Sequence, residues 1–126
     1  MTATTYVVVD VETTGLDPQT DSIIEVAAIT LRGNDILDEF TSLVNPHRPV
    51  PPFITQLTGI TQAMVDDAPT MFTLRSRLRP KIGDHVLVGH NIDFDMGFLE
   101  MERLGVGNHR LDTVTLASIV GPPEVC

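Results

Sequence analysis

The pattern of hydrophobic and polar positions predicts three strands near the start of the chain. The expected strands cover residues 5–11, 23–31 and 36–44. The first is a β-branched run interrupted by Asp10, which is typical of a central strand covered on both faces. A short turn at Gly33 and Asn34 predicts that the second and third strands form an antiparallel hairpin.

Helices alternate with short strands in the rest of the chain. Residues 45–52 hold four prolines, so we expect an extended connector there. Pro69 and Thr70 then open an amphipathic helix, which Pro80 is expected to end or kink. The other expected elements are helices at residues 53–57, 62–65, 93–104 and 113–120, and strands at residues 85–89 and 111–112. This order predicts an α/β fold, a mixed sheet with flanking helices, as a single domain over residues 1–126.

Apolar side chains at helical spacing predict which helix faces are buried. The apolar positions are Phe72, Leu74 and Leu78 in the helix after Pro69, and Phe94, Phe98, Met101 and Leu104 in the helix at residues 93–104. The second set falls on one stripe, and such stripes usually pack into a core.

Composition and charge narrow the function classes. Hydrophobic residues make up 42% of the chain and charged residues 20%, which is typical of a folded domain. The net charge of −9 disfavours a simple basic-patch nucleic-acid binder, although carboxylates that hold divalent cations would reverse the field locally. The single cysteine, Cys126, excludes an internal disulfide or a thiolate zinc cluster. No apolar run is long enough to span a bilayer, so we expect a cytoplasmic protein with no membrane partner.

Two carboxylates stand at the end of the first expected strand. Asp10 and Glu12 are two residues apart, so their side chains leave the same face, roughly 7 Å apart along the strand. Two like charges there are unfavourable unless a cation neutralises them, and Mg²⁺ or Mn²⁺ prefers carboxylate oxygens. The alternative is a strand end that runs out into solvent. The residues that follow, Thr13 to Leu16, form a polar turn in which Gly15 would let an anion approach backbone N–H groups.

A second polar cluster follows the expected strand at residues 85–89. Asp93 and Asp95 both fall in the first turn of the next helix, where the helix dipole stabilises a carboxylate. We interpret Asp93 as the N-cap of that helix. Asp95 is the candidate metal ligand, because its side chain leaves the helix about 100° from that of Phe94, which faces the core.

Together these motifs resemble those of the DEDD exonucleases, including the proofreading epsilon subunit of bacterial DNA polymerase III, RNase T-like domains and exonuclease domains fused to helicases. The matching segments are, in order, VVVDVETTGLDP, IIEVAAI, LTGIT, VGHNIDFDMGFL and LDTVTLA. The resemblance implies a ribonuclease-H-like fold, a five-stranded mixed sheet with the first strand central and helices on both faces.

The resemblance also implies a reaction and its residues. Asp10, Glu12 and Asp95 match the family's catalytic carboxylates, which hold two Mg²⁺ or Mn²⁺ ions and hydrolyse phosphodiester bonds at a single-stranded 3′ end of DNA or RNA. The products are nucleoside 5′-monophosphates, in a proofreading or repair role beside a polymerase or helicase subunit. The implied substrate-binding residues are Thr13, Thr14, Gly15, Leu16, His90, Asn91 and Phe94. Leu16 would press on the terminal base, and Asn91 is either beside the substrate or a turn residue.

The sequence departs from the family pattern at several positions. The family's third motif, a histidine and a fourth carboxylate on a final helix, is missing, so we expect a domain truncated before that helix. The alternative function is therefore a catalytically impaired module that binds a nucleotide, a metal ion or a partner. Phe53 replaces a frequent glutamate and is expected to pack in a helix interface, and Glu25 is interpreted as a structural carboxylate with a buried hydrogen-bond partner. We interpret His109 and Asp112 as a surface pair.

Overall fold

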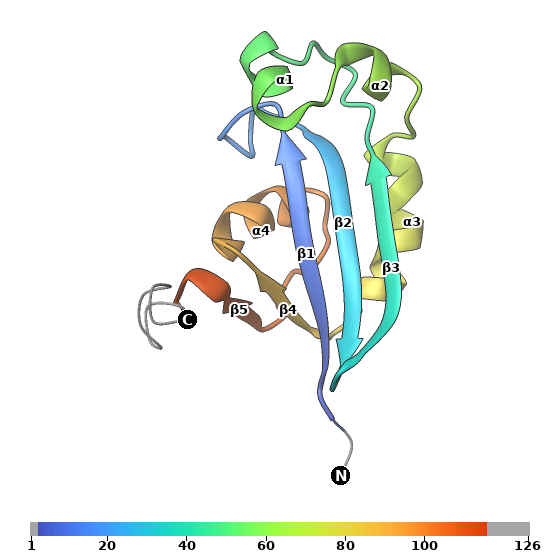
Figure 1. Ribbon diagram of the computed structural model, residues 1–126, viewed down its shortest axis with the longest axis vertical. Helices are drawn as coiled ribbons and strands as arrows, with labels where there is room; N and C mark the ends of the chain where they lie inside the picture. The colour runs from blue at the N-terminus through green and yellow to red at the C-terminus, as the bar shows by residue number, and fades with distance from the viewer. Residues whose placement is uncertain (1–2, 116–126) are drawn as a thin grey trace.

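A five-stranded mixed sheet organises the computed structural model, which describes residues 3–115 (Figure 1). Its strands are β1 (Thr5–Thr13), β2 (Ile23–Arg32), β3 (Asp35–Leu43), β4 (Val86–Gly89) and β5 (Arg110–Asp112). The strand order is β3-β2-β1-β4-β5. β1 pairs antiparallel with β2 and parallel with β4, so the predicted central position of the first strand is confirmed.

The predicted hairpin joins β2 and β3. Arg32 pairs with Asp35 across a two-residue loop, and Gly33 has φ 59°. Two-residue hairpin loops need positive φ, which glycine adopts without steric cost. β1 is longer than expected and reaches Thr13, so that Glu12 lies within the strand.

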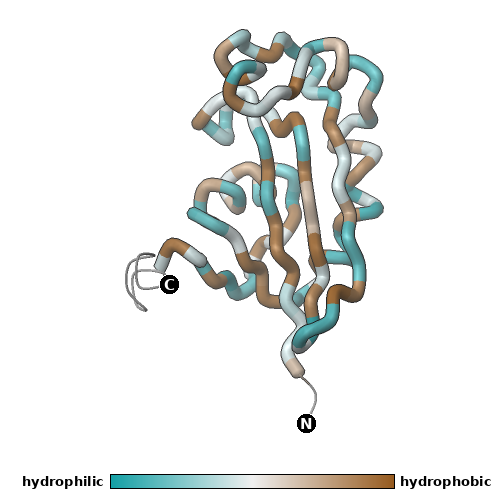
Figure 2. Tube along the Cα trace, viewed as in Figure 1, coloured by the Kyte–Doolittle hydropathy of each residue, from teal (hydrophilic) through white to brown (hydrophobic). Residues whose placement is uncertain are grey.

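Four helices pack against one face and one end of the sheet in the described part of the chain. They are α1 (Pro52–Thr58), α2 (Gln62–Asp66), α3 (Met71–Ile82) and α4 (Ile92–Met101). α3 and α4 lie behind the sheet in Figure 1, whereas α1 and α2 lie beyond the end of β1. Figure 2 shows hydrophobic positions along the central strands. The buried ones on β1 pack against α3 and α4. The opposite face of β1 is only half-buried or exposed in the described part of the chain, so the expected cover of this strand on both faces is not seen. The predicted helix at residues 113–120 falls mostly outside the described residues.

Two apolar clusters hold these elements together. The larger one joins Val7, Val9 and Val11 of β1 to the inner faces of α3 and α4. The smaller one anchors α1 and α2 over the end of the sheet, and consists of Ile24, Val50, Ile54, Ile60 and Val65, with Leu43 against it. The second cluster fixes α1 next to the end of β1, where the candidate carboxylates lie.

Some details of the predicted helices are wrong. Phe72 is 80% exposed and Met101 is 56% exposed, although both were expected in the core. Phe72 lies one position after the N-terminal residue of α3, on the side away from the sheet, and α4 ends at Met101 before the stripe is complete. Leu104 is buried as expected, but from the loop after α4.

Pro80 was expected to end or kink α3, but the helix does not end at this residue. The helix continues for two residues beyond it and closes with the Gly83 N–H donating to the Arg79 carbonyl at 2.9 Å. Proline removes one helix hydrogen bond, and the burial of Leu78 and Ile82 on either side of it holds the last turn in place. No helix among residues 3–115 has the length and apolar character needed to cross a membrane.

Candidate active site

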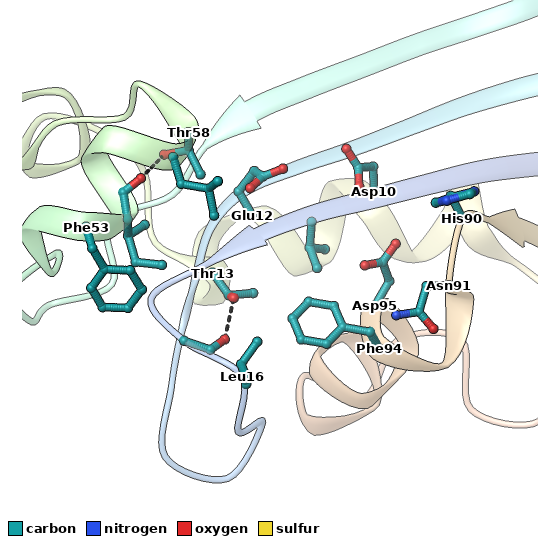
Figure 3. Close-up of a pocket in the computed structure, with 14 residues that line it drawn as sticks. Asp10, Glu12, Thr13, Leu16, Phe53, Thr58, His90, Asn91, Phe94 and Asp95 are labelled. Carbon is teal, nitrogen blue, oxygen red and sulfur yellow. Dashed lines mark hydrogen bonds between the residues drawn. The ribbon is translucent and has the colours of Figure 1, made fainter. Parts of the chain in front are cut away.

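The candidate site begins at the C-terminal half of β1. Val7, Val9 and Val11 point into the core, so the alternation of a strand turns Asp10 and Glu12 to the opposite face. Figure 3 shows both carboxylates projecting from the same side of the strand. The predicted shared face of the two side chains is confirmed.

The third carboxylate comes from the first turn of α4. Asp95 is only 4% exposed, and its Oδ2 is buried without a hydrogen-bond partner among the described residues. Buried polar atoms in proteins are nearly always hydrogen-bonded or bound to an ion. An unpartnered carboxylate oxygen beside two other carboxylates is therefore a position where a cation fits.

The carboxylates perturb one another electrostatically. Burial raises the pKa of Asp95 to about 7, and the charges of Asp10, Glu12 and Asp112 contribute to this rise. The pKa of Glu12 is raised by burial and then by Asp10 and Glu25. The pKa of Asp10 is raised by burial, although a backbone hydrogen bond with Val11 opposes this. This pattern describes a cluster of acidic groups that lacks a counter-charge among the residues described.

Glu25 belongs to this cluster, and its interpretation as a hydrogen-bonded structural group is wrong. It lies directly opposite Glu12 in the β1–β2 ladder, and within residues 3–115 its side chain accepts no hydrogen bond. Like charges opposite each other on neighbouring strands destabilise a sheet.

Within residues 3–115, no three acidic, histidine or cysteine side chains are already close enough to form a metal site. Asp10, Glu12 and Asp95 would have to draw together around an ion.

The carboxylates open into a pocket of about 470 Å³ between β1, α1 and the start of α4 (Figure 3). Its outer part is apolar, because three exposed hydrophobic side chains line it: Leu16 (83% exposed), Phe53 (62%) and Leu57 (78%). Of the predicted site residues, those that line it are Asp10, Glu12, Thr13, Gly15, Leu16, His90, Asn91, Phe94 and Asp95. The pocket therefore joins an acidic end to an apolar end, and its lining, as far as the structure describes it, includes neither lysine nor arginine.

Thr14 does not reach the pocket, whereas Gly15 lines it and also packs closely against Asp21. Thr14 is buried, and its hydroxyl donates to Asp21 Oδ1 at 3.0 Å. A Cβ on Gly15 would lie 2.4 Å from Asp21 Oδ2, so glycine at this position leaves room for the side chain of Asp21. Thr13 does face the pocket, and its hydroxyl donates to the Gly15 carbonyl at 2.6 Å.

The turn before α4 also differs from the prediction. Asn91, not Asp93, is the N-cap, with φ 60° and ψ 53°. Asparagine tolerates this left-handed conformation better than most residues, which supports its predicted turn role, and it also lines the pocket. Asp93 is exposed and accepts from Arg110 at 2.9 Å, because α4 begins one residue earlier than expected.

Phe53 and Leu57 were missed as pocket residues, and the packing role expected for Phe53 is wrong. They stand four residues apart on α1, so they share one face of that helix, and both project into the pocket. Their spacing was visible in the sequence. Which face of the helix is exposed could not be predicted from that spacing, because it depends on the packing of Ile54 in the smaller apolar cluster.

The interpretation of His109 and Asp112 as a surface pair is also wrong. His109 is exposed, whereas Asp112 is half-buried and its Oδ1 accepts from the backbone N–H of Asn91 at 2.9 Å. Asp112 thus belongs to the surroundings of the candidate site.

Comparison with known proteins identifies the family. The family model described as Exonuclease, named RNase T, matches residues 7–118. The chain is 45% identical over 124 residues to the PolC-type DNA polymerase III of Bacillus subtilis, and 44% identical over 123 residues to that of Bacillus cereus. Each match covers 94% of this chain but only 9% of the relative, so the chain corresponds to a small part of those polymerases.

Solved structures agree with this assignment. Exonuclease X, in complex with 5′ overhanging duplex DNA, has a TM-score of 0.73 at 27% identity, over 94% of this chain and 65% of its own. Escherichia coli exonuclease I, in complex with a dA16 oligonucleotide, has a TM-score of 0.78 at 18% identity, over 92% of this chain and 29% of its own. The second likeness concerns the ribonuclease-H-like fold alone. With the family model matching most of its length, the chain belongs to the exonuclease family, which hydrolyses phosphodiester bonds of nucleic acids.

Proposed function

We propose that this chain is a single DEDD-type exonuclease domain that uses two divalent metal ions, Mg²⁺ or Mn²⁺. In this proposal it hydrolyses single-stranded 3′ ends in the 3′-to-5′ direction and releases nucleoside 5′-monophosphates, in a proofreading or repair role. The supporting observation is that Asp10, Glu12 and Asp95 line one end of the same pocket, whose other end is apolar, and that the charges of Asp10 and Glu12 help to raise the pKa of Asp95. The resemblance to PolC-type polymerases supports a polymerase as the partner.

The donor set suits hard divalent cations. Asp10, Glu12 and Asp95 offer carboxylate oxygens, which Mg²⁺ and Mn²⁺ prefer, and Asp95 Oδ2 has no other partner among residues 3–115. Bound ions would lower the pKa of an attacking water and neutralise charge on the phosphate. Asp95 must lose its proton before it can act as a ligand, and its raised pKa places this step near neutral pH.

The other pocket residues would hold the end of the strand. Leu16, Phe53 and Leu57 offer exposed apolar surface on which an unpaired base can stack, whereas a base pair presents its faces to its neighbours. Thr13 and Asn91 offer polar groups beside the carboxylates. A strand end with an unpaired base therefore fits the pocket better than an intact duplex.

A second candidate function is binding without cleavage. Within residues 3–115 no three potential metal ligands already lie close enough to hold an ion, which favours a module that takes up a metal ion or nucleotide weakly. His90 stands five residues before Asp95, but both residues belong to the segment VGHNIDFDMGFL and not to a final helix that carries the family's third motif. A separate general base is thus not identified among residues 3–115.

Release of mononucleotides from single-stranded DNA tests the proposal. A 5′-labelled oligonucleotide is incubated with the chain and Mn²⁺ or Mg²⁺, and the products are separated by length. We expect stepwise shortening from the 3′ end that requires the metal and falls about 100-fold or more in Asp10→Ala. A 3′-blocked oligonucleotide and a circular single strand should both resist.

Asp67→Ala is the matched control, because Asp67 is an exposed carboxylate at the C-cap of α2 and does not line the pocket. It should cleave as the unmodified chain does. Cleavage of the circular strand would contradict exonuclease action. If nothing is cleaved but calorimetry detects Mn²⁺ binding that Asp10→Ala removes, the second candidate function holds instead.

A further inference from the structure

Helix α4, which carries Asp95 in its first turn, has no capping hydrogen bond from the side chain of its own N-cap residue. Asn91 is the N-cap of α4, and its side chain makes no capping hydrogen bond. The first backbone N–H groups of a helix lack partners inside the helix and need others. A non-glycine residue in the left-handed region also persists only where its surroundings hold it. The start of α4 therefore depends on contacts from another element.

Asp112, the last residue of β5, supplies one of these contacts. Its Oδ1 accepts from the backbone N–H of Asn91 at 2.9 Å and from that of Val114 at 2.9 Å. β5 runs parallel to β4 and pairs Asp112 with Gly89, so the sheet itself brings this carboxylate to the turn. A carboxylate beside the N-terminus of α4 also interacts favourably with the helix dipole.

Thr113 contacts the other residue of the turn. Its hydroxyl lies 2.9 Å from His90 Nδ1 and donates to the Gly89 carbonyl at 3.4 Å. A threonine hydroxyl has one proton, so a hydroxyl that donates to Gly89 must accept from His90 Nδ1–H. In the neutral ring this leaves Nε2 unprotonated. Thr113 thus holds the orientation of a histidine that lines the pocket, and its second contact with Gly89 favours the Nδ1–H tautomer of that ring.

We propose that Asp112 and Thr113 are positioning residues of the candidate site. They clamp the turn at residues 89–91, and the clamp sets where α4 begins and where the carboxylate of Asp95 lies. Neither residue lines the pocket, so both act through the turn. This inference rests on the proposed function in taking Asp95 as a metal ligand.

Two substitutions of Asp112 separate its hydrogen bonds from its charge. In Asp112→Asn the amide oxygen can still accept from both backbone N–H groups, whereas in Asp112→Ala nothing replaces the carboxylate. Residues that orient a ligand typically change metal affinity about 10- to 100-fold when they are removed. We expect that loss of Mn²⁺ affinity in Asp112→Ala, measured by calorimetric titration, and affinity close to that of the unmodified chain in Asp112→Asn.

Asp93→Ala is the matched control for loss of a nearby charge. Asp93 lies in the first turn of α4, is exposed, pairs with Arg110 and does not line the pocket. Asp93→Ala should leave Mn²⁺ affinity unchanged.

If the unmodified chain cleaves DNA, Asp112→Ala should lower kcat with little change in KM, because Asp112 does not line the pocket.

The tautomer of His90 gives a readout that does not depend on metal or activity. Imidazole ¹⁵N shifts should report the Nδ1–H form in the unmodified chain and in Thr113→Ser, and a shift toward the Nε2–H form in Thr113→Val. Unchanged shifts in Thr113→Val would overturn the role of Thr113. This measurement also stands if Asp112→Ala fails to fold.

Two results would overturn the role of Asp112. One is full Mn²⁺ affinity in a folded Asp112→Ala, and the other is an equal loss in Asp112→Ala and Asp112→Asn, which would implicate charge alone. Absence of Mn²⁺ binding in the unmodified chain would contradict the proposed function instead. In that case, loss of hydrogen-exchange protection at the Asn91 amide in Asp112→Ala, but not in Asp112→Asn, would still support the clamp, and its absence would overturn it.

Discussion

Among residues 3–115, Asp95 has the most strongly raised pKa, and this links stability to pH. Its pKa is about 7 in the folded state against 3.8 in a free side chain, so the folded state binds the proton more tightly. Stability therefore falls as pH rises from about 4 to about 7 in the absence of metal, by at most about 4 kcal/mol. In Asp95→Asn the decrease should be smaller, because only the raised pKa values of Asp10 and Glu12 remain. Denaturant unfolding at several pH values measures the difference.

Addition of Mn²⁺ gives the control for this prediction. At pH 8 the metal should raise the denaturation midpoint of the unmodified chain, because an ion that binds only the folded state stabilises it. It should have much less effect on Asp95→Asn, which lacks one ligand oxygen. Parallel pH profiles for the two proteins would contradict a buried, titrating Asp95.

Single residues were predictable where local sequence decides their position. The spacing of Asp10 and Glu12 on a strand fixed their shared face, and the position of Asp95 after a strand brought it to the same edge. Asp112 was misinterpreted because its hydrogen bond to Asn91 spans 21 positions, and only the pairing of β4 with β5 brings the two together.

At the scale of elements, α1 presents an apolar face that no described residue covers. Phe53 and Leu57 project from it into the pocket, which places them where the end of a strand would bind. Stacking of a base on an aromatic ring contributes about 1–3 kcal/mol. Phe53→Ala should therefore weaken binding of a cleavage-resistant single-stranded oligonucleotide about 10-fold, measured by fluorescence anisotropy with Mn²⁺ present.

Phe72→Ala provides the matched comparison. Phe72 is also an exposed phenylalanine on a helix, at 80% exposure on α3, but it lies outside the pocket. Its loss should not alter oligonucleotide affinity. Equal weakening by the two substitutions would point to a general loss of apolar surface, and no weakening by Phe53→Ala would remove α1 from the binding site.

The elements themselves were predicted with small errors at their ends. Strands and the hairpin followed from β-branched runs and the Gly33-Asn34 turn, since both signals are local. The errors arose where tertiary packing decides. α3 continues past Pro80 because Leu78 and Ile82 are both buried against the sheet, and α4 stops at Met101 although the apolar spacing extends to Leu104.

At the scale of the whole molecule, charge is distributed unevenly. The chain holds 8 Lys and Arg against 17 Asp and Glu. Half of the basic residues lie in α3, at Arg75, Arg77, Arg79 and Lys81. Two of these are already paired, Arg75 with Glu102 at 3.8 Å and Lys81 with Asp38 at 2.6 Å. The described lining of the pocket, by contrast, has carboxylates and no lysine or arginine.

This distribution predicts an unusual dependence of nucleic-acid binding on salt. A protein that neutralises phosphates with lysine and arginine loses affinity as NaCl rises, with a slope of about −0.7 per phosphate for single strands. Because the pocket is acidic, binding of a short single strand without divalent ions should be weak, with a slope near zero, and Mn²⁺ should strengthen it. Anisotropy titrations across NaCl concentrations measure this slope.

Arg79→Gln removes from α3 a charge that forms no ion pair among residues 3–115, and it should leave the slope unchanged. A steep slope that becomes shallower in Arg79→Gln would instead show that the strand crosses α3, and that the basic helix, rather than metal at the carboxylates, attracts the substrate.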